Sequence, residues 1–142
     1  MTKLKLDKHY SQLLASVKER IRKSQYEALK VVNKGLIGLY WDIGQMIVDR
    51  QKKYGWGKSV VVHLSEDLQK EFPGIQGFSA QNVWRMRQFY LIYAVRVKLS
   101  PLVREIGWSH NLIILMNCKD DLEREFYIRM TRKLSQYAIK QS

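Results

Sequence analysis

The chain has 142 residues, with 25 Lys and Arg against 13 Asp and Glu, so its formal net charge is +12. This length fits a single domain over residues 1–142, and a 46% hydrophobic composition excludes wholesale disorder. The single cysteine, Cys118, excludes an intramolecular disulfide and a multi-cysteine zinc site, and no apolar run is long enough for a membrane helix. We therefore expect a cytoplasmic protein without membrane, metal or cofactor, whose charge attracts a polyanion, most commonly nucleic acid.

Helical spacing dominates the chain, because only two prolines interrupt it and apolar residues recur every three or four positions. The pattern predicts an all-α, compact multi-helix domain that begins with a long pair of helices, over residues 6–21 and 26–54. The first helix carries the apolar stripe Leu6, Tyr10, Leu13, Leu14, Val17 and Ile21. The second contains Gly35, Gly38 and Gly44, which indicate either a break or, as we favour, close packing against another backbone.

The next two predicted helices flank a short turn. Residues 59–72 form the first of them, which Ser59 can cap and Pro73 ends. Ser79 caps the second, whose predicted buried face consists of Val83, Met86, Tyr90, Tyr93 and Val97. A helix, a glycine-containing turn and a second capped helix form the layout of a helix-turn-helix, here over residues 59–98.

Three shorter helices are predicted in the last third of the chain, over residues 100–106, residues 109–116 and from residue 120 onward. The last of them carries the apolar row Leu122, Phe126, Met130 and Leu134. A competing helix-turn-helix can be drawn over residues 102–116. It ranks lower, because its second helix is nearly all apolar and is expected to be buried.

The helix that follows Ser79 is the candidate for reading DNA. At 100° per residue, Gln81, Arg85 and Gln88 fall in one row opposite the apolar face, with Asn82 beside them. Arginine can pair with a guanine edge, and glutamine or asparagine with an adenine edge. We therefore expect Gln81, Asn82 and Arg85 to face the bases of double-stranded DNA.

The charge distribution supports this placement. Residues 72–104 contain no Asp or Glu, so a phosphate that approaches this segment meets no local repulsion. A second basic run flanks the Gly55-Trp56-Gly57 turn, where Trp56 is a further candidate contact. The side chains expected to contact phosphates are Lys53, Lys58, Ser79, Arg87 and Arg96. The alternative is that these residues form ordinary solvated faces.

Catalysis finds little support in the sequence. His9, His63 and His110 are widely separated, and no metal-ligand spacing occurs. Asp121 and Glu123 resemble part of a metal-dependent nuclease site, but acidic residues at a helix start have a simpler explanation in the helix dipole. We therefore expect the chain not to be an enzyme.

A rival hypothesis comes from a different class of protein. The chain is then a protein-interaction or oligomerisation domain, and its basic charge serves docking to an acidic partner or to a nuclease subunit. The stripe over residues 6–21 is the discriminating feature, because it can meet the core of this chain or pair with a second copy in a homodimer. Dimerisation and DNA binding are compatible, since a two-fold dimer presents two helices to the DNA.

A series of short motifs occurs in order along the chain. They are Leu39-Tyr40-Trp41-Asp42-Ile43-Gly44, Tyr54-Gly55-Trp56-Gly57, Leu64-Ser65-Glu66-Asp67-Leu68, Glu71-Phe72-Pro73-Gly74, Gly77-Phe78-Ser79, Asn82, Met86-Arg87, Phe89-Tyr90 and Trp108-Ser109-His110. Together they resemble the N-terminal domain of the YhcG family over residues 10–132. The number of ordered motifs makes the resemblance specific, although each motif alone is weak.

The resemblance implies an α-helical domain that is regarded as a DNA-binding helix-turn-helix module and that precedes a PD-(D/E)XK-type nuclease domain in bacterial proteins. It therefore implies DNA as the polyanion and a nuclease as a partner. The chain departs from the family pattern after Met130, where neither the usual Gly-Trp-containing stretch nor the nuclease follows. The chain is then a stand-alone or shortened form, or another chain supplies the nuclease, and cleavage by this polypeptide is not implied.

Overall fold

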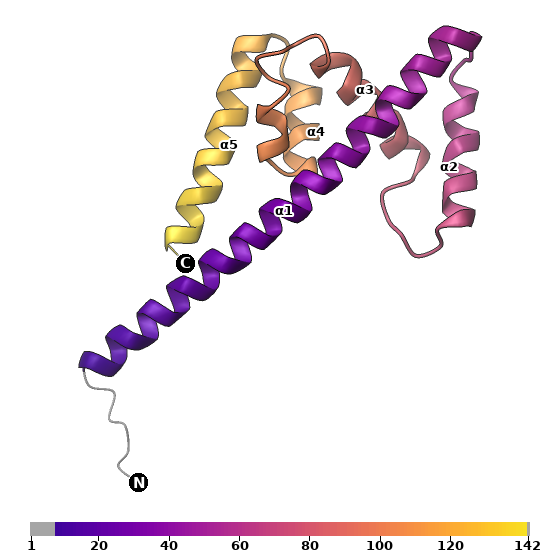
Figure 1. The fold of residues 1–142 in the computed structure, drawn as a ribbon. Helices are drawn as coiled ribbons and strands as arrows, with labels where there is room; N and C mark the ends of the chain where they lie inside the picture. The colour runs from indigo at the N-terminus through magenta and orange to yellow at the C-terminus, as the bar shows by residue number, and fades with distance from the viewer. Residues whose placement is uncertain (1–7, 142) are drawn as a thin grey trace.

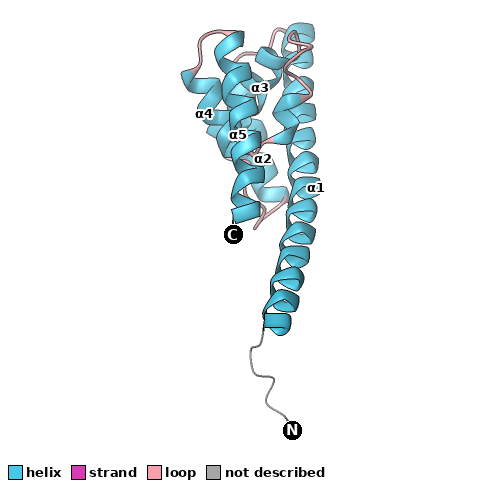
Figure 2. Ribbon diagram, turned by 90° about the vertical axis from the view of Figure 1, so that its left-hand side faces the viewer, coloured by secondary structure: helices cyan, strands magenta, loops and turns pink. Residues whose placement is uncertain are grey.

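A computed structural model describes the backbone of residues 8–141 and the side chains of residues 8–136. The described residues form five α-helices and one short 3₁₀ helix, with no strand (Figures 1 and 2). The elements are α1 (Lys8–Tyr54), α2 (Ser59–Glu71), α3 (Ala80–Tyr93), η1 (Leu102–Glu105), α4 (Trp108–Asn117) and α5 (Asp121–Gln141). The all-α prediction is confirmed.

Helix α1 is one unbroken helix where the sequence predicted two. Its 47 residues extend for about 70 Å. The predicted gap between residues 21 and 26 contains neither glycine nor proline, so nothing in it ends a helix. Figure 1 shows that the N-terminal half of α1 projects beyond the other helices. The predicted stripe residue Leu6 lies outside the described residues.

The C-terminal half of α1 packs against α3 and forms the core. Ile37, Phe89 and Tyr93 are fully buried there, together with residues from η1, α4 and α5. A methyl group added at Gly44 would collide with the backbone carbonyl of Met86 on α3. Close backbone approach, as predicted, therefore explains this glycine.

The connection between α2 and α3 is held by hydrogen bonds from α2 and by a close contact with α1. Ser65 Oγ donates a hydrogen bond of 2.6 Å to the carbonyl of Phe78, and Gln69 Nε2 donates to the same oxygen at 3.0 Å. Gly77 has a φ of +103°, which favours glycine, and a methyl group added there would collide with the hydroxyl of Tyr40. The connection runs over residues 72–79, which is longer than the three or four residues of the usual helix-turn-helix turn.

The caps and ends of these two helices differ in part from the predictions. Ser79 caps α3 as predicted, because its Oγ accepts a hydrogen bond of 3.2 Å from the backbone N–H of Asn82. Ser59 is the first residue of α2 and gives no side-chain cap, since Lys58 before it is already helical. The prediction for Val97 is wrong, because α3 ends at Tyr93 and the side chain of Val97 is 81% exposed.

Helix α5 buries a different face from the predicted one. Ile128 and Arg124 point to the core, and Arg124 Nη2 donates to the carbonyl of the buried Cys118 at 3.2 Å. All four residues of the predicted apolar row are exposed, namely Leu122, Phe126, Met130 and Leu134. The spacing located the helix correctly, but the long stem of Arg124 and its hydrogen bonds let the core accept a charged residue instead.

Helix α4 is less buried than expected. Asn111 and Ile114 face the core, where Asn111 Nδ2 donates a hydrogen bond of 2.9 Å to the carbonyl of Val103. Ile113 and Met116 are exposed.

Within the described part of the chain, no helix combines the length and hydrophobicity needed to cross a membrane.

Candidate nucleic-acid interface

The predicted row lies on the outer side of α3. Gln81 is exposed, whereas Arg85 and Gln88 are partly exposed. Arg85 Nη1 donates a hydrogen bond of 2.8 Å to Gln88 Oε1, which orients the guanidinium along the helix surface. The opposite side of α3 is occupied by Val83, Met86 and Phe89, all fully buried. The helix therefore presents amide and guanidinium groups outward because its apolar side is held against α1 and α2.

A hollow of about 360 Å³ lies beside this row. Four of the predicted site residues line it together, and Leu112 and Met116 of α4 form the facing wall. The four residues are Ser79, Gln81, Asn82 and Arg85. The structure thus brings together the three predicted base-facing side chains and one of the predicted phosphate contacts.

Asn82 is engaged inside the protein. Its Nδ2 donates a hydrogen bond of 2.6 Å to the carbonyl of Gly77, and its Oδ1 accepts one of 2.8 Å from Nε1 of Trp108. Burial raises the pKa of Tyr40, and a hydrogen bond with Asn82 partly offsets that shift. The Asn82 amide therefore ties the turn before α3 to α1 and α4, and its polar atoms are less available to a base edge than those of Gln81.

Two predicted phosphate contacts meet over one aromatic ring. Lys58 Nζ lies 5.2 Å from the ring centroid of Trp84, and the guanidinium carbon of Arg87 lies 4.6 Å from it. Arg87 Nε also donates to Oε1 of Gln51 on α1. This Lys58–Trp84–Arg87 stack holds two cations beside the outer row of α3.

Trp84 and Gln51 were not identified from the sequence as residues of this site. Tryptophan at helical spacing indicates a core position, but Trp84 lies only 60° from the Gln81 position on a helical wheel and is half-buried. That angle was available from the sequence. The contact between Gln51 and Arg87 joins residues 36 positions apart, and no local pattern indicates it.

The other two predicted phosphate contacts lie away from the stack. Lys53 lies near the end of α1, with its Nζ 5.3 Å from the ring centroid of Tyr54, and Tyr54 stacks on Trp56 at 5.0 Å. Arg96 lies beyond the C-terminal end of α3, where its Nε donates to Asp121 Oδ1 at 2.6 Å. The hydrogen bond from Arg96 lowers the pKa of the Asp121 carboxyl. The charge of Arg96 is therefore already paired within the protein.

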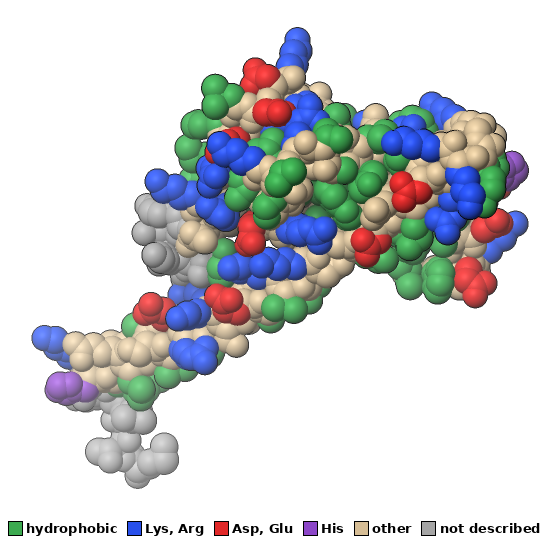
Figure 3. Space-filling view, turned by 45° about the horizontal axis from the view of Figure 1, so that its top comes forward, with side chains coloured by type: hydrophobic (Ala, Val, Ile, Leu, Met, Phe, Trp, Pro, Cys, Tyr) green, Lys and Arg blue, Asp and Glu red, His purple; other side chains and the backbone are tan. Residues whose placement is uncertain are grey.

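Figure 3 shows how charge is spread over one face of the molecule. Lys and Arg side chains gather in several separate groups on this face, with Asp and Glu between some of them. One basic group lies at the right-hand end of the view, where the end of α1 and α2 are found. The positive charge forms local patches on this face rather than one continuous surface.

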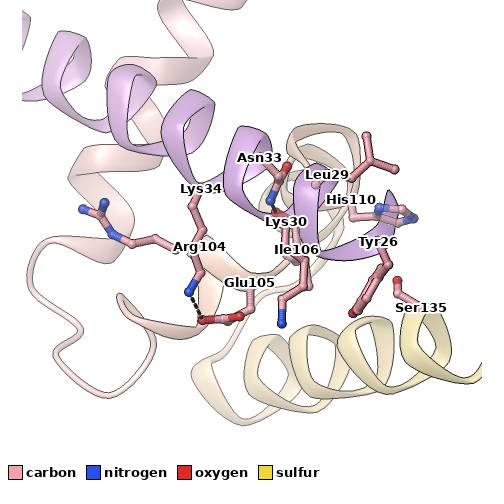
Figure 4. Close-up of a pocket in the computed structure, with 11 residues that line it drawn as sticks. Tyr26, Leu29, Lys30, Asn33, Lys34, Arg104, Glu105, Ile106, His110 and Ser135 are labelled. Carbon is pink, nitrogen blue, oxygen red and sulfur yellow. Dashed lines mark hydrogen bonds and ion pairs between the residues drawn. The ribbon is translucent and has the colours of Figure 1, made fainter. Parts of the chain in front are cut away.

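A second hollow, of about 230 Å³, lies between α1, η1 and α5 (Figure 4). Lys34 Nζ forms an ion pair of 3.2 Å with Glu105, and Asn33 Nδ2 donates to the carbonyl of Ile106 at 2.9 Å. Tyr26 and Ser135 close the end of the hollow nearest α5. These contacts attach η1 to α1.

Among the described residues, no group of three or more His, Cys, Asp or Glu side chains is placed to hold a metal ion.

Comparison with known proteins identifies the family of this chain but gives no information on its function. No curated protein and no solved structure matches the chain. The family model for the DUF1016 N-terminal domain matches residues 16–140, which is most of the chain. This is the family that the ordered motifs resemble, and its matched segment covers every described helix from within α1 to α5. The chain therefore belongs to the YhcG/DUF1016 N-terminal domain family.

Proposed function

We propose that this domain binds double-stranded DNA and that α3 enters the major groove as the reading helix of a helix-turn-helix variant. The observation that carries the proposal is the outward row of Gln81, Arg85 and Gln88 beside the Lys58–Trp84–Arg87 stack. The row offers amide and guanidinium donors suited to base edges, and the stack offers two cations to the flanking phosphates. Apart from Lys58, all of these residues belong to the acid-free segment 72–104.

Each residue has a separate role in this proposal. Gln81 and Arg85 contact bases, whereas Asn82 positions the start of α3 through its bonds to Gly77 and Trp108. The phosphate contacts are Lys53, Lys58, Ser79, Arg87 and Arg96. Arg96 contributes least of these, because Asp121 already neutralises its charge.

The proposal extends to a nuclease-associated system in bacteria, in which this domain targets DNA and another domain or chain cleaves it. The described residues lack a metal-binding cluster of the kind that nucleases of this type use. We therefore expect no nicking of plasmid DNA by this chain with added Mg²⁺. Nicking would contradict the separation of targeting from cleavage.

Duplex binding tests the proposal directly. Fluorescence anisotropy of a labelled duplex is measured as the salt concentration rises from about 50 to 200 mM, with a single strand and an RNA of the same sequence as competitors. We expect steep weakening with salt and a preference for the duplex. Absence of binding at low salt, or a preference for either competitor, would overturn the proposal.

Arg85→Ala separates base contact from general charge. We expect it to weaken binding to a selected sequence by about 1 to 3 kcal/mol and to relax sequence preference, because a bidentate contact is lost. Arg129→Ala is the charge-matched control, since Arg129 lies on α5 and pairs with Glu125. Equal effects of the two substitutions would show that Arg85 acts only through its charge.

The phosphate contacts are tested by the salt slope. Lys58→Ala and Arg87→Ala should each weaken binding to all sequences and reduce the slope of log K against log salt by about one. Lys133→Ala, on the exposed side of α5, should leave the slope unchanged. A slope unaltered in all three variants would remove the stack from the interface.

A further inference from the structure

Helix α1 carries a continuous exposed apolar stripe that no other part of the described chain covers. Its members repeat every 11 residues in three series, namely Leu14, Gln25 and Leu36; Val17, Ala28 and Leu39; Ile21, Val32 and Ile43. Gln25 is the single polar member. Ile43 is half-buried, and the other members are exposed. An 11-residue repeat corresponds to 3.67 residues per turn, so the stripe runs almost straight along the helix.

This stripe is distinct from the face that α1 uses in its own domain. The buried residues Ile37, Tyr40 and Gly44 lie about 120° around the helix from the stripe. Every residue from 11 to 25 is exposed, so this projecting segment has no core of its own. An isolated helix of about 15 residues is marginal in water, which favours a partner along it. Figure 3 shows green apolar patches along the lower edge of the projecting arm.

Charge along α1 selects the partner and its direction. Residues 8–34 are strongly basic, whereas residues 35–49 contain two Asp and no Lys or Arg. The basic side chains are Lys8, Lys18, Arg20, Arg22, Lys23, Lys30 and Lys34, against Glu19 and Glu27. A second α1 in parallel would place basic segment against basic segment. An antiparallel α1 whose midpoint lies near Ala28 places residues 8–21 of each copy, with Lys8, Lys18 and Arg20, along the acidic segment of the other, so that like charges face each other only over residues 22–34.

We propose that α1 pairs antiparallel with α1 of a second copy of this chain through this stripe. Reversal about a two-fold axis near Ala28 places Val17 opposite Leu39, and Ile21 within one residue of Leu36. The small side chain of Ala28 then lies at the axis, where the two helices approach most closely. The paired segment, residues 14–43, gives about 45 Å of helix contact.

The C-terminal end of the stripe opens into an apolar groove between α1 and α2. This groove has a volume of about 430 Å³, and Ile43, Met46, Trp56 and Leu64 are among its lining residues. In the antiparallel arrangement, the first turns of the partner's α1 reach the groove. The pairing therefore covers both the projecting half of α1 and the apolar end of the α1–α2 contact.

The oligomeric state of the full chain tests the pairing without DNA, so the result is independent of the proposed DNA binding. Sedimentation velocity over a concentration series should show a dimer. Val32→Glu should raise the dimer dissociation constant by about tenfold or more, because it buries a charge in the apolar stripe.

Val31→Glu is the matched control. Val31 and Val32 are 72% and 68% exposed, but Val31 lies 100° around the helix and outside the stripe. Both substitutions are therefore tolerated by the folded monomer, and circular dichroism checks this. A monomer at all concentrations, or equal effects of the two variants, would overturn the proposal.

Spin labels determine the direction of pairing. Ser16 lies on the side of α1 opposite the stripe, so Ser16→Cys in a Cys118→Ala background can be labelled without disturbing the contact. The antiparallel dimer places position 16 opposite position 40 of the partner, which separates the labels by about 36 Å or more along the axis. A distance clearly shorter than about 36 Å indicates a parallel pair, in which the two labels lie at the same level along the axis, and overturns the antiparallel arrangement.

Discussion

The two halves of α1 have similar amphipathic sequences but opposite surroundings. In the C-terminal half, Ile37, Gly44 and Ile47 are buried against α2 and α3. In the N-terminal half, Leu14, Val17 and Ile21 also recur at helical spacing, but they are exposed. Helical periodicity therefore predicts which residues share a face. It does not predict whether the chain itself covers that face.

The largest expected effect comes from the buried half. Gly44→Ala should reduce the free energy of unfolding by about 1 to 3 kcal/mol or more, because the added methyl group collides with the Met86 carbonyl. Gly35→Ala is the control within the same helix, since nothing lies within 4 Å of the added methyl group. It should raise stability by about 0.5 to 1 kcal/mol through helix propensity. Urea denaturation measures both, and similar values for the two would mean that α1 and α3 are not in backbone contact.

The stability of the protein at alkaline pH depends on Tyr93, which is buried in the core beneath α1. Burial raises the pKa of Tyr93 to about 12, and its hydroxyl has no hydrogen-bond partner among the described residues. The proton is held more tightly in the folded state. Stability is therefore complete below the unfolded pKa near 10 and falls as the pH rises toward 12, by about 2 to 3 kcal/mol.

Tyr93→Phe separates this group from other tyrosines. It should stay within about 1 kcal/mol of the parent at neutral pH, because no hydrogen bond is lost. Its stability should fall less steeply above pH 10, although Tyr40, whose pKa burial also raises, keeps part of the slope. Denaturation curves of the parent and of Tyr93→Phe at several alkaline pH values measure this difference. An equal loss of stability with pH in the two proteins would contradict the assignment to Tyr93.

A smaller effect is expected where α1 meets the turn before α3. Asn82→Ala leaves Nε1 of Trp108 and the carbonyl of Gly77 without their partner, and should cost about 1 to 2 kcal/mol. Gln81→Ala, at the exposed neighbouring position, should stay within about 0.5 kcal/mol. A loss of stability in Gln81→Ala equal to that in Asn82→Ala would remove the distinction between the positioning residue and the proposed base contact.

The smallest effect on global stability is expected in the projecting half. Hydrogen exchange in Val32→Glu should show fast exchange for residues 11–25 and continued protection for residues 37–48, because only the second segment has a core. In the parent chain, slower exchange over residues 11–25 should appear as the protein concentration rises. Exchange that is independent of concentration would mean that nothing covers the arm.

The sequence was sufficient for features whose causes are local. The Ser79 cap and the buried row of Val83 and Met86 follow from residue type and spacing, whereas of the three glycines expected to allow close packing only Gly44 lies against another backbone. The join between the two predicted N-terminal helices was missed because a polar stretch was interpreted as a boundary. Only a helix breaker would have justified that boundary.

The rest depends on contacts between distant residues. The Asn82 side chain was predicted to face a base, but its hydrogen bond with Trp108 spans 26 positions and has no local signal. The predicted apolar row of α5 is exposed, because Arg124 and Ile128 face the core instead, and the Arg124 guanidinium donates to the carbonyl of Cys118. Which of two amphipathic faces enters a core is decided by such pairings.

The unbroken course of α1 has a mechanical consequence. Once a partner covers its projecting half, α1 has no glycine or proline from residue 8 to residue 34 and bends only gently over that length. Near its C-terminal end, α1 contacts the backbone of α3 at Gly44, with no side chain between the two backbones. In the proposed pair, a rotation imposed on the first turns of α1 would reach α3, the helix that carries Arg85, along several tens of ångströms of helix.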